Sequence, residues 1–204
     1  MERFVEWVWL KTSDSLAVDG LLIFGDRQEI DRVVHALSLI RQHDPVRYRR
    51  LLSDLRRIWI LVISYRGQFQ ESTWTCQLDQ RFVLDEKTPL ELIASVIVHE
   101  ATHARLARVG IDYREELRHR IEQVCIRRQM AFTKALPGAT EAFDEAKSML
   151  ENLPDMSDAA MTEDAFAAEV EAARYVGVPD WLLRRMIALR KWRIKRVAAK
   201  SRWN

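Results

Sequence analysis

The residues best suited to chemistry lie in one short segment, His99-Glu100-Ala101-Thr102-His103. His99 and His103 are four residues apart, so on a helix both imidazoles leave the same face about one turn apart. Two nitrogens at that separation can bind one zinc ion at about 2.0–2.1 Å each. Glu100 points beside the ion, where it can take a proton from a water molecule that the metal activates. This is the H-E-x-x-H signature of zinc-dependent hydrolases.

The surroundings of this segment favour a metal over two histidines that meet by chance. Apart from Glu100, the residues from Leu92 to Ala104 carry no carboxylate or basic group other than the histidines, which indicates that this part of the helix is buried. Histidine and glutamate side chains are costly to bury without polar partners. A bound metal supplies that compensation, and we therefore expect a metal site here.

A catalytic zinc needs a third protein ligand and one open position. The helix expected after the turn Gly110-Ile111-Asp112 offers Glu122 and His119, and antiparallel helices joined by a short turn place residues equidistant from it opposite each other. Glu122 lies twelve residues after Gly110, and His99 lies eleven before it. We expect Glu122 to be the third ligand, with His119 as the alternative. A helical salt bridge between Glu122 and Arg118 is the purely structural interpretation.

His99-Glu100-Ala101-Thr102-His103 on one helix, with Glu122 nineteen residues beyond His103 on the next, resembles the gluzincin group of zinc metallopeptidases. The resemblance covers residues 58 to about 136. It implies that His99, His103 and Glu122 bind Zn²⁺, that Glu100 is the general base, and that the substrate is a peptide or protein. It also implies a zincin-like core, in which an edge strand before the motif helix lines the cleft and binds substrate backbone.

Three features depart from the gluzincin pattern. Arg105 stands where these enzymes usually have a hydrophobic residue, two positions after the second histidine. Ile126 stands where thermolysin-like enzymes have an aspartate that supports a zinc-binding histidine, so that support must come from elsewhere. The residue that stabilises the oxyanion stays open among Tyr113, His119 and Tyr175. A compact relative therefore fits better than a full thermolysin-type enzyme.

Two cysteines do not make a disulfide framework. Cys76 invites comparison with peptide deformylases, whose motif resembles this one but whose third ligand is a cysteine upstream of it. Cys76 lies 23 residues before His99, yet the deformylase signature around that cysteine is missing. We therefore expect Cys76 to be a small buried hydrophobe, and Cys125 to be a core residue.

The elements that must position these residues are a small sheet followed by helices. Hydrophobic patterning predicts a short buried strand at 20–25 and then two helices at about 26–40 and 45–55. Branched and aromatic residues at 58–64 and alternation at 81–85 predict strands of a small antiparallel sheet. Capping residues, glycines and prolines delimit the remaining helices at about 88–110, 112–137, 140–152, 158–176 and from 179 onward.

The composition fits one globular domain. The chain has 204 residues, 48% of them hydrophobic, with 6 Gly, 5 Pro and 2 Cys. These values exclude a disordered, collagen-like or disulfide-stapled protein. We therefore expect an α+β fold, mostly helical with a small antiparallel sheet before the motif helix. A single zincin-like domain would span 1–204, with a basic C-terminal helix or tail at about 179–204.

Charge is unevenly distributed despite a net charge of only +2. Residues 139–173 hold ten acidic residues against one lysine, whereas residues 181–204 hold nine basic residues and no acid. We expect the first half of the basic helix to pack on the protein and its end, after about Trp192, to be solvated. Contact of this tail with nucleic acid or a membrane is the less favoured alternative.

Nothing in the sequence predicts export or membrane insertion. The longest apolar run, Ile58–Ile63, is far shorter than the roughly 20 residues that span a bilayer. The segment Met1–Trp7 is acidic and lacks a signal-peptide cleavage site. We therefore expect a cytoplasmic zinc-dependent hydrolase, most simply a metallopeptidase. The alternative is a metal-stabilised interaction or regulatory protein without turnover.

Overall fold

The computed structural model describes residues 14–200, and the side chains of its last helix up to Arg190 together with Trp192. The segment Met1–Trp7, considered above as a signal peptide, lies outside these residues. The first half of the chain contains β1 (Asp14–Val18), β2 (Leu21–Gly25), α2 (Arg27–His43), α3 (Pro45–Asp54), β3 (Arg57–Leu61), β4 (Gly67–Gln70), β5 (Thr75–Asp79) and α4 (Gln80–Leu84). The second half contains α5 (Leu90–Arg108), α6 (Glu115–Ala135), α7 (Thr140–Glu151), α8 (Asp158–Tyr175) and α9 (Asp180–Lys200).

The sheet has five strands in the order β1-β2-β3-β5-β4. It is mixed: β3 runs parallel to both β2 and β5, while the edge strands β1 and β4 pair antiparallel with their neighbours. The expected antiparallel sheet is therefore wrong for the central strands. The helices α2 and α3 form the crossover that a parallel β2–β3 pair requires. The buried run Ile58-Trp59-Ile60 is typical of such a central strand.

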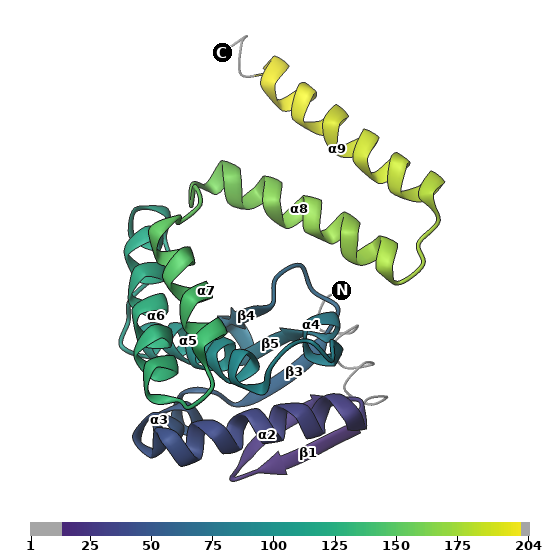
Figure 1. Ribbon diagram of the computed structural model, residues 1–204. Coiled ribbons are helices and arrows are strands. Elements are labelled where there is room, and N and C mark those ends of the chain that lie inside the picture. The colour runs from purple at the N-terminus through teal and green to yellow at the C-terminus, as the bar shows by residue number, and fades with distance from the viewer. Residues whose placement is uncertain (1–13, 201–204) are drawn as a thin grey trace.

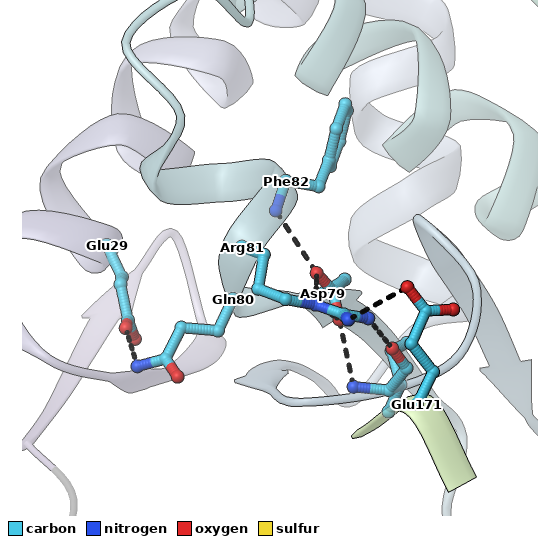
Figure 2. Close-up of polar contacts among 7 residues, drawn as sticks. Glu29, Asp79, Gln80, Arg81, Phe82 and Glu171 are labelled. Atoms are coloured by element: carbon cyan, nitrogen blue, oxygen red, sulfur yellow. Dashed lines mark hydrogen bonds and ion pairs between the residues drawn. The ribbon is translucent and has the colours of Figure 1, made fainter. Parts of the chain in front are cut away.

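The segment Arg81–Asp85, predicted as a strand, is instead part of the short helix α4 and its end. Asp79 caps this helix, since its Oδ1 accepts a hydrogen bond from the Phe82 backbone N–H at 3.1 Å (Figure 2). Its carboxylate also accepts from the Arg81 guanidinium and from the Ile63 backbone N–H. This local cap overrides the alternating hydrophobic pattern. The α4 side chain Gln80 donates to buried Glu29 on α2 at 2.5 Å (Figure 2).

The helix that carries the motif lies in the centre of the fold. α5 packs against α2 and α3, against the edge strand β4, and against α6 (Figure 1). Every residue from Leu92 to Ala101 is buried, as the uncharged surroundings of the motif predicted. Gly110, with φ of +80°, adopts the left-handed conformation near the end of α5, and a short loop leads to α6. The contact between α5 and α6 therefore determines which side chains can face the two histidines.

The hydrophobic core is formed by the sheet and by α2 to α7, and its buried residues lie between Leu21 and Ala142. The fold is α+β, as predicted. α8 and α9 form a helical hairpin outside this core, and α9 packs chiefly against α8 (Figure 1). None of the helices within residues 14–200 combines the length and hydrophobicity needed to cross a bilayer.

Candidate metal centre

α5 brings its two motif histidines together on one face. The Nε2 atoms of His99 and His103 lie 3.1 Å apart, with their ring centroids at 5.0 Å. His99 is buried and His103 is half-buried, because His103 lies one turn nearer the helix end. The spacing of four residues thus has the predicted consequence: two imidazole nitrogens converge on one point.

α6 adds the carboxylate of Glu122 to the same point. Its Oε2 lies 3.3 Å from His99 Nε2, and its Oε1 lies 3.3 Å from His103 Nε2. Burial by itself raises the pKa of Glu122, but hydrogen bonds and the charges of both histidines outweigh it and hold the pKa well below 4.5. The three residues predicted from spacing are therefore adjacent in space, and they form a two-histidine, one-carboxylate donor set.

Gln129 determines which nitrogen of His99 faces this donor set. The Ser95 hydroxyl donates to the Leu92 carbonyl at 2.9 Å, so it accepts from Gln129 Nε2 at 3.1 Å. That bond turns Gln129 Oε1 toward His99 Nδ1, 3.1 Å away, which must then donate. In its neutral form, His99 is thereby held as the tautomer whose Nε2 lone pair is free for a metal.

Gln129 supplies the hydrogen bond to His99 that Ile126, with its apolar side chain, cannot make. This role of Gln129 was not predicted from the sequence. Ile126 is fully buried, and it packs in the core next to the site. Gln129 follows Glu122 by seven residues, two helical turns, and so lies on the same face of α6. A polar residue at that spacing from the expected ligand was the available signal. The donor set and its hydrogen-bonded histidine fit Zn²⁺, which binds imidazole nitrogen and carboxylate oxygen.

Glu100 lies between the histidines and the edge strand of the sheet. Burial raises the pKa of Glu100 above its ordinary 4.5, and the nearby His99 and His103 only partly offset this rise. Gly67 on β4 lies so close that an added Cβ would meet Glu100 Cγ and Oε1 at 3.1 Å. The carboxylate is therefore a desolvated proton acceptor held against β4.

Tyr113, in the loop before α6, is the oxyanion candidate that lies at the site. Its hydroxyl donates to Glu122 Oε1 at 2.6 Å, and its ring contacts the His103 ring edge-on with centroids 5.5 Å apart. The two other candidates lie elsewhere. His119 is exposed and hydrogen-bonds Gln123, and Tyr175 lies at the end of α8 beneath the Arg81 guanidinium.

Three further side chains near the motif in sequence, His119, Arg118 and Arg105, do not join the cluster of His99, His103 and Glu122. His119 does not approach the histidines as a third ligand. Arg118 pairs with Asp158 at 2.6 Å and with the Met156 carbonyl, so the salt bridge with Glu122 considered from the sequence is wrong. Arg105 points away from the centre and pairs with the buried carboxylate of Asp54 at 3.3 Å. Its departure from the gluzincin pattern thus reflects a local ion pair.

Cys125 is buried, as predicted, but its surroundings were not anticipated. Its Sγ and one nitrogen each of His99 and His103 all lie within 4.8 Å of one another. Cys76 is also fully buried, in β5, and this cluster of described residues does not include it. The comparison with deformylases through Cys76 is therefore not supported by the geometry.

A cavity of about 650 Å³ opens over His99, His103 and Glu122. Its walls come from β4, from the facing surfaces of α5 and α6, and from the segment that joins α7 to α8. Most of the lining is apolar, and it includes Phe69, Leu106, Ile121, Met149 and Met161. A cavity of this size and character can hold a few residues of an extended chain.

The basic helix α9 lies away from this cavity. Leu183 is buried, whereas Trp181, Leu182 and Leu189 are exposed, so only one face of the helix packs as expected. Arg190 lies over the Phe166 ring and pairs with Glu163 on α8. Arg190 of the basic helix thus pairs with an acidic residue of α8. The side chains beyond Trp192 lie outside the described ones.

No family model, curated protein or solved structure matches this chain. The resemblance to gluzincins therefore rests on the motif, its spacing to Glu122 and the geometry described above.

Proposed function

We propose that this protein is a zinc-dependent hydrolase that cleaves peptide bonds. The observation that carries the proposal is the convergence of His99, His103 and Glu122 beside the buried carboxylate of Glu100, at the wall of an apolar cavity. Two histidines and a carboxylate are a donor set of catalytic zinc, which keeps a further position open.

His99, His103 and Glu122 would hold the metal, with Gln129 and Tyr113 orienting His99 and Glu122 through hydrogen bonds. Bound zinc supplies Lewis-acid polarisation of a carbonyl and lowers the pKa of water to about 7. Glu100 takes a proton from the attacking water and delivers it to the leaving amine. Its raised pKa suits both steps, since burial makes the carboxylate a stronger base toward water and its acid form can then donate to the amine.

β4 gives the substrate a place to bind. It is an edge strand, so one side of its backbone is not paired within the sheet, and Gly67, Gln68 and Phe69 line the cavity. An extended peptide can add to such an edge through main-chain hydrogen bonds. This agrees with the role that the gluzincin resemblance implies for the strand before the motif helix.

The first experiment is metal analysis of the purified protein by elemental mass spectrometry. We expect about one zinc per chain, and loss of that zinc in His103→Ala. His119→Ala is the matched control, because this exposed histidine lies away from the site and its loss should leave the zinc in place. Zinc-loaded protein is then incubated with a mixed peptide library. Absence of metal after reconstitution with zinc would refute the proposal.

A metal-stabilised interaction protein without turnover is the second candidate, and the surface of α9 favours it. Trp181, Leu189 and Trp192 are 62%, 59% and 51% exposed, beside the basic residues Arg184 and Arg185. Exposed tryptophans of this kind often mark interaction surfaces. Under this candidate, chelation would lower thermal stability, and zinc-loaded protein would leave every peptide in the library intact.

A further inference from the structure

α6 directs three side chains with metal-binding or hydrogen-bonding atoms toward the histidines of α5. Glu122, Cys125 and Gln129 are spaced by three and four residues, so they share one face of the helix. Glu122 already pairs with both histidines, and Gln129 orients His99. The role of Cys125, whose side chain is completely buried, is not explained by the proposed reaction.

The Cys125 sulfur lies almost close enough to the two histidine nitrogens to bind the same metal ion. Zinc binds sulfur at about 2.3 Å and imidazole nitrogen at about 2.0–2.1 Å, so sulfur and nitrogen lie about 3.6 Å apart in a tetrahedral site. The sulfur and the two histidine nitrogens lie within 4.8 Å of one another. An approach of about 1 Å at most would complete the geometry, and rotation of a side chain can supply it.

Glu122 and Cys125 differ in their access to the cavity. Glu122 lines the cavity together with Ile121 and Ile126, whereas Cys125 lies outside that wall. We infer that Cys125 is a second ligand from α6 for the same metal ion and can replace Glu122. The carboxylate serves on the cavity side, and the sulfur retains the ion on the core side when the carboxylate is displaced. This inference rests on the metal site of the proposed function.

Cobalt substitution tests the inference without any measurement of activity. Co²⁺ bound to a thiolate has a strong charge-transfer absorption in the near ultraviolet, whereas imidazole and carboxylate ligands do not produce it. Glu122→Gln, which nearly preserves the shape of the side chain, is titrated with Co²⁺ alone. We expect it to bind the ion and to show the thiolate band.

Adding Cys125→Ala to Glu122→Gln is expected to remove the band and to weaken Co²⁺ binding at least about tenfold. Cys76→Ala in the same background is the matched control. Cys76 is equally buried but lies outside the histidine cluster, so this variant should keep the band. If the double variant with alanine does not fold, Cys125→Ser replaces it, since the hydroxyl is close in size and removes only the sulfur.

The outcomes separate this inference from the proposed function. Binding of Co²⁺ to Glu122→Gln without a thiolate band would overturn the role of Cys125 and leave the metal site intact. A band that persists after removal of Cys125 would also overturn it. If the wild-type protein itself binds neither Co²⁺ nor Zn²⁺, the proposed function fails, and the inference fails with it.

Discussion

A chain of hydrogen bonds through Gln129 determines which ring nitrogen of the buried His99 donates a hydrogen bond. The Ser95 hydroxyl donates to the Leu92 carbonyl and therefore accepts from the Gln129 amide N–H. The Gln129 oxygen then accepts a hydrogen bond from His99 Nδ1. Without this chain, the neutral imidazole could turn its protonated nitrogen toward His103 and Glu122. Gln129, which is not one of the proposed metal ligands, therefore fixes the orientation of His99 before any metal binds.

Gln129→Ala tests this preorganisation. Loss of the acceptor at His99 Nδ1 is expected to lower zinc affinity about 10–100-fold, because support of this kind orients the ligand. Zinc affinity can be measured by competition with a chromogenic chelator. Gln123→Ala, an exchange on the same helix, is the control. Equal affinities for the two variants would contradict the role of Gln129.

Glu100→Gln separates metal binding from catalysis. The amide keeps the shape of the side chain but cannot accept the proton from water, so kcat should fall about 10²–10⁴-fold with unchanged zinc content. Glu116→Gln, in the exposed first turn of α6, should leave both quantities unchanged. Retained turnover in Glu100→Gln would show that another group is the base.

At the scale of helices and strands, the contact between β4 and α5 determines how close the edge strand lies to Glu100. A Cβ at Gly67 would meet Val96 Cγ1 at 2.6 Å, so only glycine lets the strand approach the helix this closely. The approach keeps the edge strand beside Glu100 at the cavity wall. The close contact thus keeps the edge strand proposed to bind peptide next to the proposed general base.

Gly67→Ala should disturb stability and activity together. Overpacking of this kind costs about 1–3 kcal/mol of the free energy of unfolding, and it pushes β4 away from Glu100. Gln68→Ala, on the exposed side of the same strand, is expected to change stability little. Urea denaturation and peptide cleavage measure the two effects. A Gly67→Ala protein with wild-type stability would show that the strand can move freely.

The stability of the whole molecule is expected to depend on pH through ionisable groups at the candidate metal centre. In the metal-free protein, burial alone would lower the pKa of His99, but the hydrogen bond with Glu122 and nearby carboxylate charges outweigh it and raise this pKa above 6.5. That stabilisation is complete below 6.5 and is lost as the pH rises through the folded-state value. The lowered pKa of Glu122 stabilises the protein above 4.5, and this contribution is lost as the pH falls.

The metal-free protein should therefore be most stable between about pH 4.5 and 6.5. Glu100 shifts the maximum toward the acidic end of this window, because burial raises its pKa and its ionisation destabilises the fold. Midpoints of urea denaturation across this range and beyond it test the prediction. Glu122→Gln should flatten the acidic limb, and added zinc should move the optimum upward by favouring unprotonated histidine. Stability that keeps rising above pH 6.5 without metal would be the contrary result.

Features that depend on local spacing could be predicted from the amino-acid sequence. Histidines four residues apart share a helix face wherever that helix lies, and the absence of other charges around them required burial. Distances along the chain from the Gly110 turn, together with the apolar neighbours of Glu122, favoured Glu122 over His119, and Glu122 does lie beside both histidines. Helix limits followed from capping residues, although the Asp79 cap at α4 was not recognised against an alternating pattern.

Features that depend on how separate elements pack could be seen only in three dimensions. The parallel pairing of β3 with β2 follows from the helical crossover through α2 and α3, whereas its parallel pairing with β5 arises because β4 lies at the sheet edge and β5 lies between β3 and β4. The contacts that α5 makes with Gln129, Cys125 and Gly67 exist only because α6 and β4 pack against this helix. Periodicity indicates which face of a helix is buried, but the partner of that face is determined by packing between segments far apart in the sequence.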